Sequence, residues 1–440
     1  MIWELLGPAS EPTGTRDDRV DEGEARPVGH HFAVSVMEVA LNLVLQASTS
    51  LRAAAKCFGI FQQREQPSFW TIRNWVLRLG LYELRRAKCP ASDWVFIVDA
   101  TIAIGPHKAL VILGVRLSQM EVRGFNLGHQ DVTTLGLCLL TRCDGPAVQA
   151  EVAAAARAVG VPRLVVSDGG ADVKKGVALF QAEHPEVDWN YDLTHRLARL
   201  LEKRLATAVW WQEFGRQVGP CRQGCQQTAW SHLQPPTLRT KARWFNLESL
   251  IEWGLQVLAY GRRERLSGDD QFAKLFGWLG AYESELKEAR QIVAMIEAVS
   301  QIIKHGGLNA AQVRRCEARI RQLGTTAETR GFGQEVREFL REQLTKVRCG
   351  ETLLGSSDVI ESVFGKYKAV VEQSPLKAIT SMVLMVAALT SVRTQAVIVE
   401  AMEAVGMADV DEWFAENGER SLLAKRREVF KRKMIGTITA

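Results

Sequence analysis

The segments WVFIVDAT at residues 94–101 and RLVVSDGG at residues 163–170 decide the fold. Each contains a short apolar run rich in valine and ends that run in an aspartate, Asp99 in the first segment and Asp168 in the second. Such runs are typical of buried strands. Outward from them we expect strands at 110–117, 133–140 and 187–191, helices at 151–159 and 173–181, and a turn at Gly105-Pro106. The order β-β-β-α-β-α-β predicts an α/β fold built on a mixed sheet with helices on its faces.

A third acidic residue is expected on a helix that follows the sheet. The segment SSDVIESVFGKYK at residues 356–368 predicts a helix that Ser356 or Ser357 could cap, with Glu361 on the same face as Phe364 and Lys368. An acid that faces inward is costly unless it is paired or binds a cation. The basic residues Lys366 and Lys368, one and two turns beyond Glu361, suit a phosphate backbone and are candidate DNA contacts.

Each of these acids has an alternative interpretation. A single aspartate at the end of a strand is more often a turn residue or a helix cap than a functional group. Asp358 could be the third acid in place of Glu361, but it lies in the first helical turn, where capping acids are common. In the same way, Asp172 is an alternative to Asp168. We favour Asp168 and Glu361.

The order strand-Asp99, strand-Asp168 and helix-Glu361 resembles the RNase H-like catalytic core of DDE transposases. It is most similar to the group that carries a large all-α insertion between the second aspartate and the glutamate. The segment Asp192-Leu-Thr-His195, directly after the last expected strand, is similar to the Cys/Asp-x-x-His motif of the hAT-like and Mutator-like superfamilies.

One bacterial signature of this family is absent. The pattern Tyr-x-x-Arg-x-x-x-Glu-x6-Lys would need Tyr and Arg where Leu354 and Ser357 stand. The subfamily, and any hairpin chemistry attached to it, therefore stays open.

The resemblance implies a metal-dependent reaction on DNA. Phosphodiester cleavage builds charge on the attacking and the leaving oxygen, and two Mg²⁺ ions roughly 3.5–4 Å apart stabilise both. Mn²⁺ is expected to substitute. Asp99 would bridge the two ions, Asp168 and Glu361 would each hold one, and the fourth catalytic residue, His195, would steady the scissile phosphate or an inner strand. Water would attack in the cutting step and a freed 3′-hydroxyl in the joining step.

The resemblance also implies partners and a place in the cell. The partner is double-stranded DNA, both transposon ends and target, bound by a homodimer or larger synaptic complex. The source would be a cut-and-paste bacterial insertion sequence, and the protein would be cytoplasmic and nucleoid-associated.

Two alternative functions remain: an RNase H-fold endonuclease, and a catalytically inactive transposase-derived DNA-binding regulator. The intact acids argue against the regulator.

The N-terminal region predicts a helical DNA-binding domain. Residues 33–90 hold eight Lys or Arg against three acids. We expect one helix after Ser50 and a second after Ser68, as in a helix-turn-helix reader. The polar face of the second helix supplies the candidate DNA contacts Thr71, Arg73, Asn74 and Arg78. A three-helix packing domain with a solvated basic face is the alternative.

The helical insertion holds six tryptophans, most of which we expect in its core. Trp244, beside Arg239, Lys241 and Arg243, is the candidate for stacking on a flipped base, and these four residues complete the expected DNA contacts. Cys221, Cys225 and His232 could suggest zinc, but no fourth ligand has suitable spacing.

Composition limits the remaining choices. The chain has 440 residues, 47% hydrophobic and 24% charged, and a net charge of +5, which permits nucleic acid binding without requiring it. The eight scattered cysteines, the acidic start and the short longest apolar run, residues 382–389, predict a reducing compartment and no membrane.

These patterns divide the chain into six parts. We expect a flexible arm at 1–32, the helical DNA-binding domain at 33–90, the first part of the core at 91–195 and the all-α insertion at 196–354. The catalytic helix follows at 355–375 and a C-terminal helical tail at 376–440. The apolar residues Met382, Leu384, Val386 and Leu389 of that tail could be core or interface.

Overall fold

A five-stranded mixed sheet forms the centre of the molecule. The computed structural model describes residues 25–104, 107–237, 243–371, 379–418 and 430. The strands are β1 (Trp94–Ile104), β2 (His107–Arg116), β3 (Thr133–Leu140), β4 (Leu164–Ser167) and β5 (Asp188–Tyr191), in the order β3-β2-β1-β4-β5. β1, β2 and β3 pair antiparallel, whereas β4 and β5 run parallel to β1. All the expected strands are therefore present, and the expected turn at 105–106 lies outside the described residues.

Alternation along β1 assigns its side chains to two faces of the sheet. Phe96 and Val98 belong to one buried cluster, with helices α5 (Gly145–Val159) and α6 (Ala171–Glu183). Val95 and Ile97 belong to the other cluster, with helix α14 (Asp358–Val371). Because side chains in a strand alternate with a period of two, Asp99 shares the α14 face with Val95 and Ile97.

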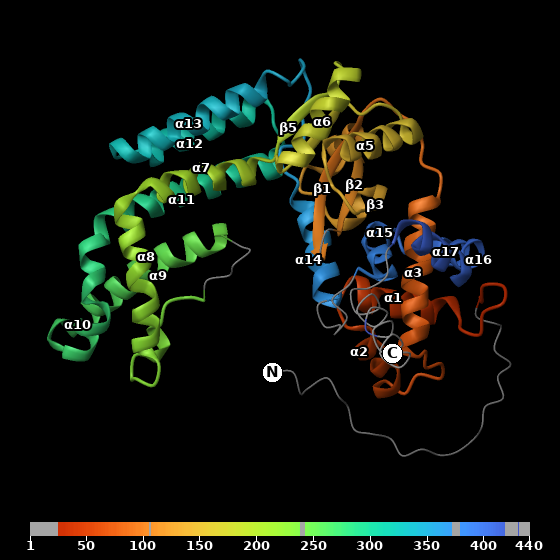
Figure 1. Ribbon diagram of the computed structural model, residues 1–440, viewed down its shortest axis with the longest axis horizontal. Helices are drawn as coiled ribbons and strands as arrows, with labels where there is room; N and C mark the ends of the chain where they lie inside the picture. The colour runs from red at the N-terminus through yellow and green to blue at the C-terminus, as the bar shows by residue number, and fades with distance from the viewer. Residues whose placement is uncertain (1–24, 105–106, 238–242, 372–378, 419–429, 431–440) are drawn as a thin grey trace, which may run out of the picture.

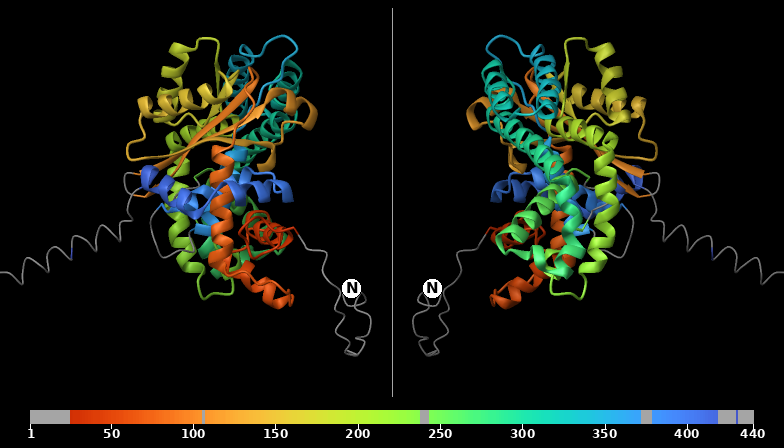
Figure 2. Two further views of the ribbon diagram at one scale, coloured as in Figure 1. Left: turned by 90° about the vertical axis from the view of Figure 1, so that its right-hand side faces the viewer. Right: turned by 90° about the vertical axis from the view of Figure 1, so that its left-hand side faces the viewer.

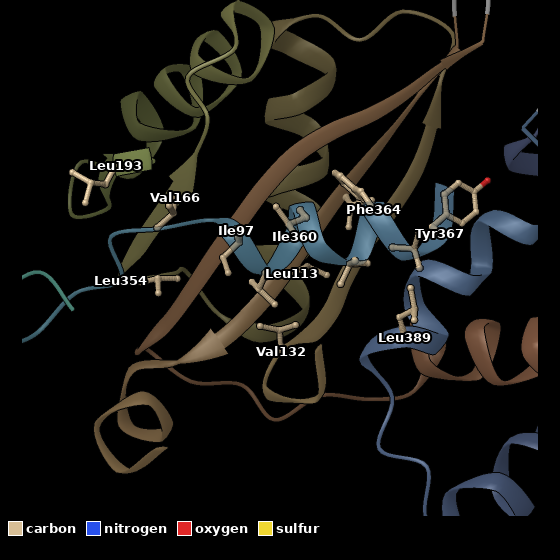
Figure 3. Packing of buried hydrophobic residues seen from close by; sticks show 14 of the residues in the cluster. Ile97, Leu113, Val132, Val166, Leu193, Leu354, Ile360, Phe364, Tyr367 and Leu389 are labelled. Atoms are coloured by element: carbon tan, nitrogen blue, oxygen red, sulfur yellow. The ribbon is translucent and has the colours of Figure 1, made fainter. Parts of the chain in front are cut away.

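Helix α14 crosses the sheet on this second face (Figure 3). Its residues Ile360, Phe364 and Tyr367 are buried. Figure 3 shows Ile360 near Ile97 and Leu113, whereas Tyr367 lies at the other end of the helix, toward Leu389. The apolar face of α14 packs on the sheet and so fixes the rotation of the helix. Glu361, directly after Ile360, therefore lies at the border of the helix–sheet interface and not inside it. The side chain of Glu361 is 48% exposed, which corrects the expectation that it faces fully inward.

The region between β5 and α14 is all helical in its described part. It contains α7 (Leu193–Thr207), α8 (Val209–Cys225), α9 (Arg243–Arg263), α10 (Asp270–Phe276), α11 (Glu283–Gly306), α12 (Ala310–Leu323) and α13 (Ala327–Leu344). Figure 1 shows these helices extending to one side of the sheet as an arm. An all-α insertion at this point of the chain agrees with the sequence expectation.

Arg163 holds the end of this arm against the sheet. Its guanidinium is buried and donates from Nε and Nη2 to the two carboxylate oxygens of Glu351, at 2.9 and 2.7 Å. Nη1 donates to Asp188 Oδ2 at 2.5 Å, and Nη2 also donates to the Lys346 carbonyl at 2.8 Å. Such a bidentate pair is directional, so the chain returns from the arm at a fixed place just before α14.

The N-terminal and C-terminal helices pack together beside the sheet (Figures 1 and 2). They are α1 (Val34–Leu45), α2 (Leu51–Ile60), α3 (Phe69–Arg85), α15 (Met385–Thr390), α16 (Gln395–Ala404) and α17 (Met407–Asn417), and a short helix, α4 (Leu117–Arg123), follows β2. A Cβ on Gly80 of α3 would lie 2.1 Å from the Leu384 carbonyl oxygen, so glycine permits this close approach.

The C-terminal apolar residues belong to the core of the chain. Each is at most 8% exposed: Met382, Leu384, Val386 and Leu389. Their burial places them in the core, whereas the sequence had left both core and interface open. Among the described helices, none is both long enough and apolar enough to cross a bilayer.

Candidate active site

Strand pairing places Asp99 and Asp168 next to each other. Val98 of β1 pairs with Ser167 at the end of β4, so the next residue of each strand is an aspartate. The sequence expectation that β1 ends at Asp99 is wrong: β1 continues to Ile104 because its other neighbour, β2, still pairs with it there. Only the parallel partner β4 stops, at Ser167.

Local hydrogen bonds fix both aspartates. Asp99 accepts from the backbone N–H of Ala100 at 2.7 Å, and Asp168 Oδ1 accepts from that of Gly170 at 2.8 Å. Gly169, which directly follows Asp168, has φ +71°, and a Cβ there would lie 2.3 Å from the Tyr191 ring. The turn that presents Asp168 therefore requires glycine for both its backbone conformation and its close packing.

The pKa of Asp99 is raised by burial and by the neighbouring acids. Burial raises it to about 7, with further increases from the neighbouring charges of Asp168 and Glu361. Two carboxylates that repel a third disfavour its ionised form. The three predicted acids therefore act on one another electrostatically, although they come from β1, the turn after β4 and helix α14.

Glu361 is paired with His195, the histidine of the Asp-x-x-His segment. His195 Nδ1 lies 3.2 Å from Glu361 Oε1 and 3.1 Å from Asp192 Oδ1. The hydrogen bond to Asp192 is the first cause that raises the pKa of His195 to about 9, and Glu361 adds to it. Burial raises the pKa of Glu361, and the charge of His195 opposes that increase. A cationic imidazole thus lies between two carboxylates at the edge of the acid cluster.

Asp192 joins α7 to the start of α14. It is fully buried, and its Oδ1 accepts from the backbone N–H of His195 at 2.7 Å, which caps α7. Its Oδ2 accepts from the backbone N–H of Ser357 at 2.5 Å and from the Ser357 hydroxyl at 2.9 Å. The hydrogen bond and the charge of the His195 ring, followed by the backbone N–H groups of His195 and Ser357, lower the pKa of Asp192 despite its burial. The sequence pattern identifies Asp192 as part of a motif and Ser357 as a possible helix cap. It does not indicate that these two residues bond to each other.

The two alternative acids have partners of their own. Asp358 Oδ2 lies 2.9 Å from Lys304 Nζ. Asp172 Oδ2 lies 3.4 Å from Lys108 Nζ, in the first turn of α6. Neither of them contacts His195, whereas Glu361 does. The choice of Asp168 over Asp172 and of Glu361 over Asp358 stays a prediction.

The cluster suits a metal by its chemistry but is not assembled as a metal site. Among the described residues, no three His, Cys, Asp or Glu side chains are grouped closely enough to hold an ion. Asp99, Asp168 and Glu361 offer only carboxylate oxygens, the donors that Mg²⁺ prefers. The raised pKa of Asp99 shows repulsion that a divalent cation would relieve. The donor types therefore fit Mg²⁺, while Glu361 is directed at His195.

The expected DNA-reading face of α3 is not open. Thr71, Arg73, Asn74 and Arg78 are all half-buried. Arg73 Nη2 donates to the Ser381 hydroxyl at 2.9 Å, and Arg78 donates to the carbonyls of Met402 and Val405. C-terminal residues, distant in sequence, pack on this face, so it is neither a fully exposed reading face nor the solvated face of the alternative interpretation. DNA contact by these residues stays a prediction.

The remaining predicted DNA contacts have mixed placements. Lys366 Nζ donates to the carbonyls of Leu45 and Gln46, and Lys368 Nζ is exposed and lies 5.9 Å from the Phe364 ring centroid. Arg239 and Lys241 lie outside the described residues, as do the side chains of Arg243 and Trp244 at the start of α9.

The tryptophans of the arm pack as expected. Trp253 is buried, and Trp210, Trp211, Trp230 and Trp278 pack against the core. Cys221 and Cys225 are buried thiols in α8, whereas His232 is exposed and adjoins the Trp230 ring. This arrangement gives no support to a zinc site.

Comparisons with known proteins give limited information. No protein-family model matches the sequence. No curated protein matches it at a significant level. Among solved structures, the Drosophila P element transposase strand transfer complex is similar over 84% of this chain and 92% of that chain, with 12% sequence identity and a TM-score of 0.38.

Proposed function

We propose that this chain is a DNA transposase with an RNase H-like core, which cleaves DNA at transposon ends and joins those ends to target DNA. The observation that carries the proposal is geometric: the pairing of Val98 with Ser167 sets Asp99 and Asp168 side by side, and Glu361 of α14 contacts His195 at 3.2 Å. Three acids from three separate elements, with a histidine beside them, are costly to place together without a function that uses them.

We propose that Asp99, Asp168 and Glu361 hold Mg²⁺, or Mn²⁺ in its place. Bound there, the metal would supply charge stabilisation to the attacking and leaving oxygens of a phosphodiester. In the present arrangement Glu361 pairs with His195 at 3.2 Å, so it must turn from His195 toward the aspartates to share an ion with them. His195, held by Asp192 and protonated near neutral pH, is then free to donate to a phosphate oxygen.

The rest of the fold supports this assignment in two ways. Asp192 and Ser357 fix the start of α14, and Arg163 fixes the chain just before it, so the third acid is positioned by buried contacts. The all-α arm lies beside the cluster, where the sequence resemblance places an insertion.

The experiment that tests the function uses DNA carrying the sequences that flank the gene. Purified protein with Mg²⁺ should cut this DNA at defined ends and yield products joined to a target plasmid, and chelation should prevent both. Cutting without any joined product would assign the protein to the endonucleases. Specific end binding without cutting would assign it to the inactive regulators.

A further inference from the structure

Three basic side chains, from His129, Lys366 and Arg393, meet beside helix α14. His129 precedes β3, Lys366 lies on α14 itself, and Arg393 follows α15. Arg393 is only 9% exposed, whereas His129 and Lys366 are half-buried and open toward solvent. A buried guanidinium is unusual unless an anion accompanies it.

The hydrogen-bond partners of Arg393 are neutral. Its Nε donates to Asn42 Oδ1 at 2.9 Å, and its Nη1 donates to the Ser391 carbonyl at 3.1 Å. His129 Nε2 lies 2.9 Å from the Ser362 hydroxyl on α14. In the described part of the chain, neither residue is ion-paired with a carboxylate.

Lys366 is also without a carboxylate among the described residues. Its Nζ donates to the carbonyls of Leu45 and Gln46, at 3.2 and 3.0 Å. Those carbonyls lie at the end of α1, where the helix dipole supplies a partial negative charge. A partial charge of about half an electron does not neutralise the full charges of Lys366 and Arg393.

The basic groups also destabilise one another. Burial lowers the pKa of His129, and the charges of Lys366 and Arg393 lower it further. Burial and the charge of Arg393 lower the pKa of Lys366. Burial lowers the pKa of Arg393 as well. The cluster therefore has desolvated positive charge with like charge beside it, which a bound anion would relieve.

We propose that His129, Lys366 and Arg393 form a binding site for a phosphate group, with the Ser362 hydroxyl as a fourth donor. A guanidinium beside an ammonium suits a tetrahedral oxyanion with several acceptor oxygens. Ser362 and Lys366 lie on α14, the helix that carries Glu361, so a phosphate of bound DNA is one source. A free phosphate compound is the other. The first source rests on the proposed function, whereas the second does not.

The first experiment measures thermal unfolding of the full chain in inorganic phosphate and in chloride at equal ionic strength. Phosphate should raise the Tm of the wild type, and Arg393→Gln should lose that rise. The matched control is Arg123→Gln, which removes the same charge from an exposed side chain paired with Asp131 at 3.0 Å. It should keep the rise in full.

The second experiment separates the two sources by measuring binding of duplex DNA without metal, as a function of salt. If the site takes a DNA phosphate, Arg393→Gln should bind about tenfold more weakly than Arg123→Gln, with a salt slope reduced by about one. If phosphate stabilises the protein but DNA binding is unchanged, the ligand is a free phosphate compound.

A second variant keeps the test decisive. Lys366→Gln is made at a half-exposed position, so it can replace Arg393→Gln if the latter does not fold. Folded variants that respond to phosphate and bind DNA as Arg123→Gln does would overturn the proposal and leave Lys366 as a cap of α1. Neither measurement needs cleavage, so a failure here is distinguishable from a failure of the proposed nuclease chemistry.

Discussion

Asp192 and Ser357, 165 positions apart in the sequence, are joined by two hydrogen bonds to a single carboxylate oxygen. The backbone N–H and the hydroxyl of Ser357 both donate to Asp192 Oδ2. The other oxygen of Asp192 holds His195. The carboxylate thus sets the start of the helix that carries Glu361 relative to the histidine that contacts it.

The first prediction concerns this connection. Ser357→Ala removes the hydroxyl bond at 2.9 Å and leaves the backbone bond in place. We expect a loss of about 1–3 kcal/mol in the free energy of unfolding. We also expect a lower kcat for DNA cleavage with little change in KM, since Glu361 loses its position and the DNA surface does not. The control is Ser356→Ala, whose hydroxyl only accepts from the Asp358 N–H at 3.2 Å. Equal cleavage rates for the two variants would contradict the positioning role.

The second prediction concerns the ionisation of His195. Its pKa is about 9 in the folded protein, against 6.5 for a free histidine. Because the folded state holds the proton more tightly, the stabilisation is fully present below pH 6.5 and is lost as pH rises through 9. Comparison of the wild type with His195→Gln from pH 6 to 10 measures this dependence. Asp192→Asn should move the histidine NMR titration toward 6.5, and a titration that stays near 9 in that variant would assign the shift to another group.

The third prediction concerns Asp99. Burial and the neighbouring acids hold its pKa at about 7 in the folded protein, against 3.8 for a free aspartate, so the folded state holds more protons between these values. The contribution of Asp99 to stability therefore falls as pH rises from 3.8 to 7. Asp99→Asn should lack this contribution and be more stable than the wild type at pH 8. Mg²⁺ should raise the Tm of the wild type at pH 8 and leave that of Asp99→Asn much less changed. An equal Mg²⁺ effect on both would place the metal elsewhere.

The fourth prediction concerns assembly. Recombination of two ends requires two active sites, and one chain provides one cluster of Asp99, Asp168 and Glu361. We expect the active species to be a homodimer or larger synaptic complex on two DNA ends. Mass measurement of the protein with end DNA tests this. A single chain on a single end that completes both cutting and joining would rule it out.

Much of the core could be predicted from sequence because its signals are local. The apolar runs before Asp99 and Asp168 and the helical period around Ile360 and Phe364 are each visible within about a dozen residues. Alternation then places Asp99 on the face that α14 covers. What failed was strand length, since the extension of β1 beyond Asp99 depends on pairing with β2, which no short window contains.

The features that were missed depend on distant segments. The polar face of α3 was expected in solvent because residues 33–90 give no sign that the carbonyls of Met402 and Val405 will accept from Arg78. The partner of Asp192 could not be identified because Ser357 follows a long helical insertion. Likewise, the meeting of Arg393 with Lys366 depends on packing of the C-terminal helices.

The most direct test of the central claim is cleavage of end DNA by isosteric variants of five acids in one assay. Asp99→Asn, Asp168→Asn and Glu361→Gln should each lower the single-turnover rate in Mg²⁺ by at least about a thousandfold while end binding persists. Asp172→Asn and Asp358→Asn, whose carboxylates pair with Lys108 and Lys304, should remain within about tenfold of the wild type. If Glu361→Gln cleaves normally and Asp358→Asn does not, the third member of the acid set has been misassigned. If all five variants cleave like the wild type, this cluster is not the active site.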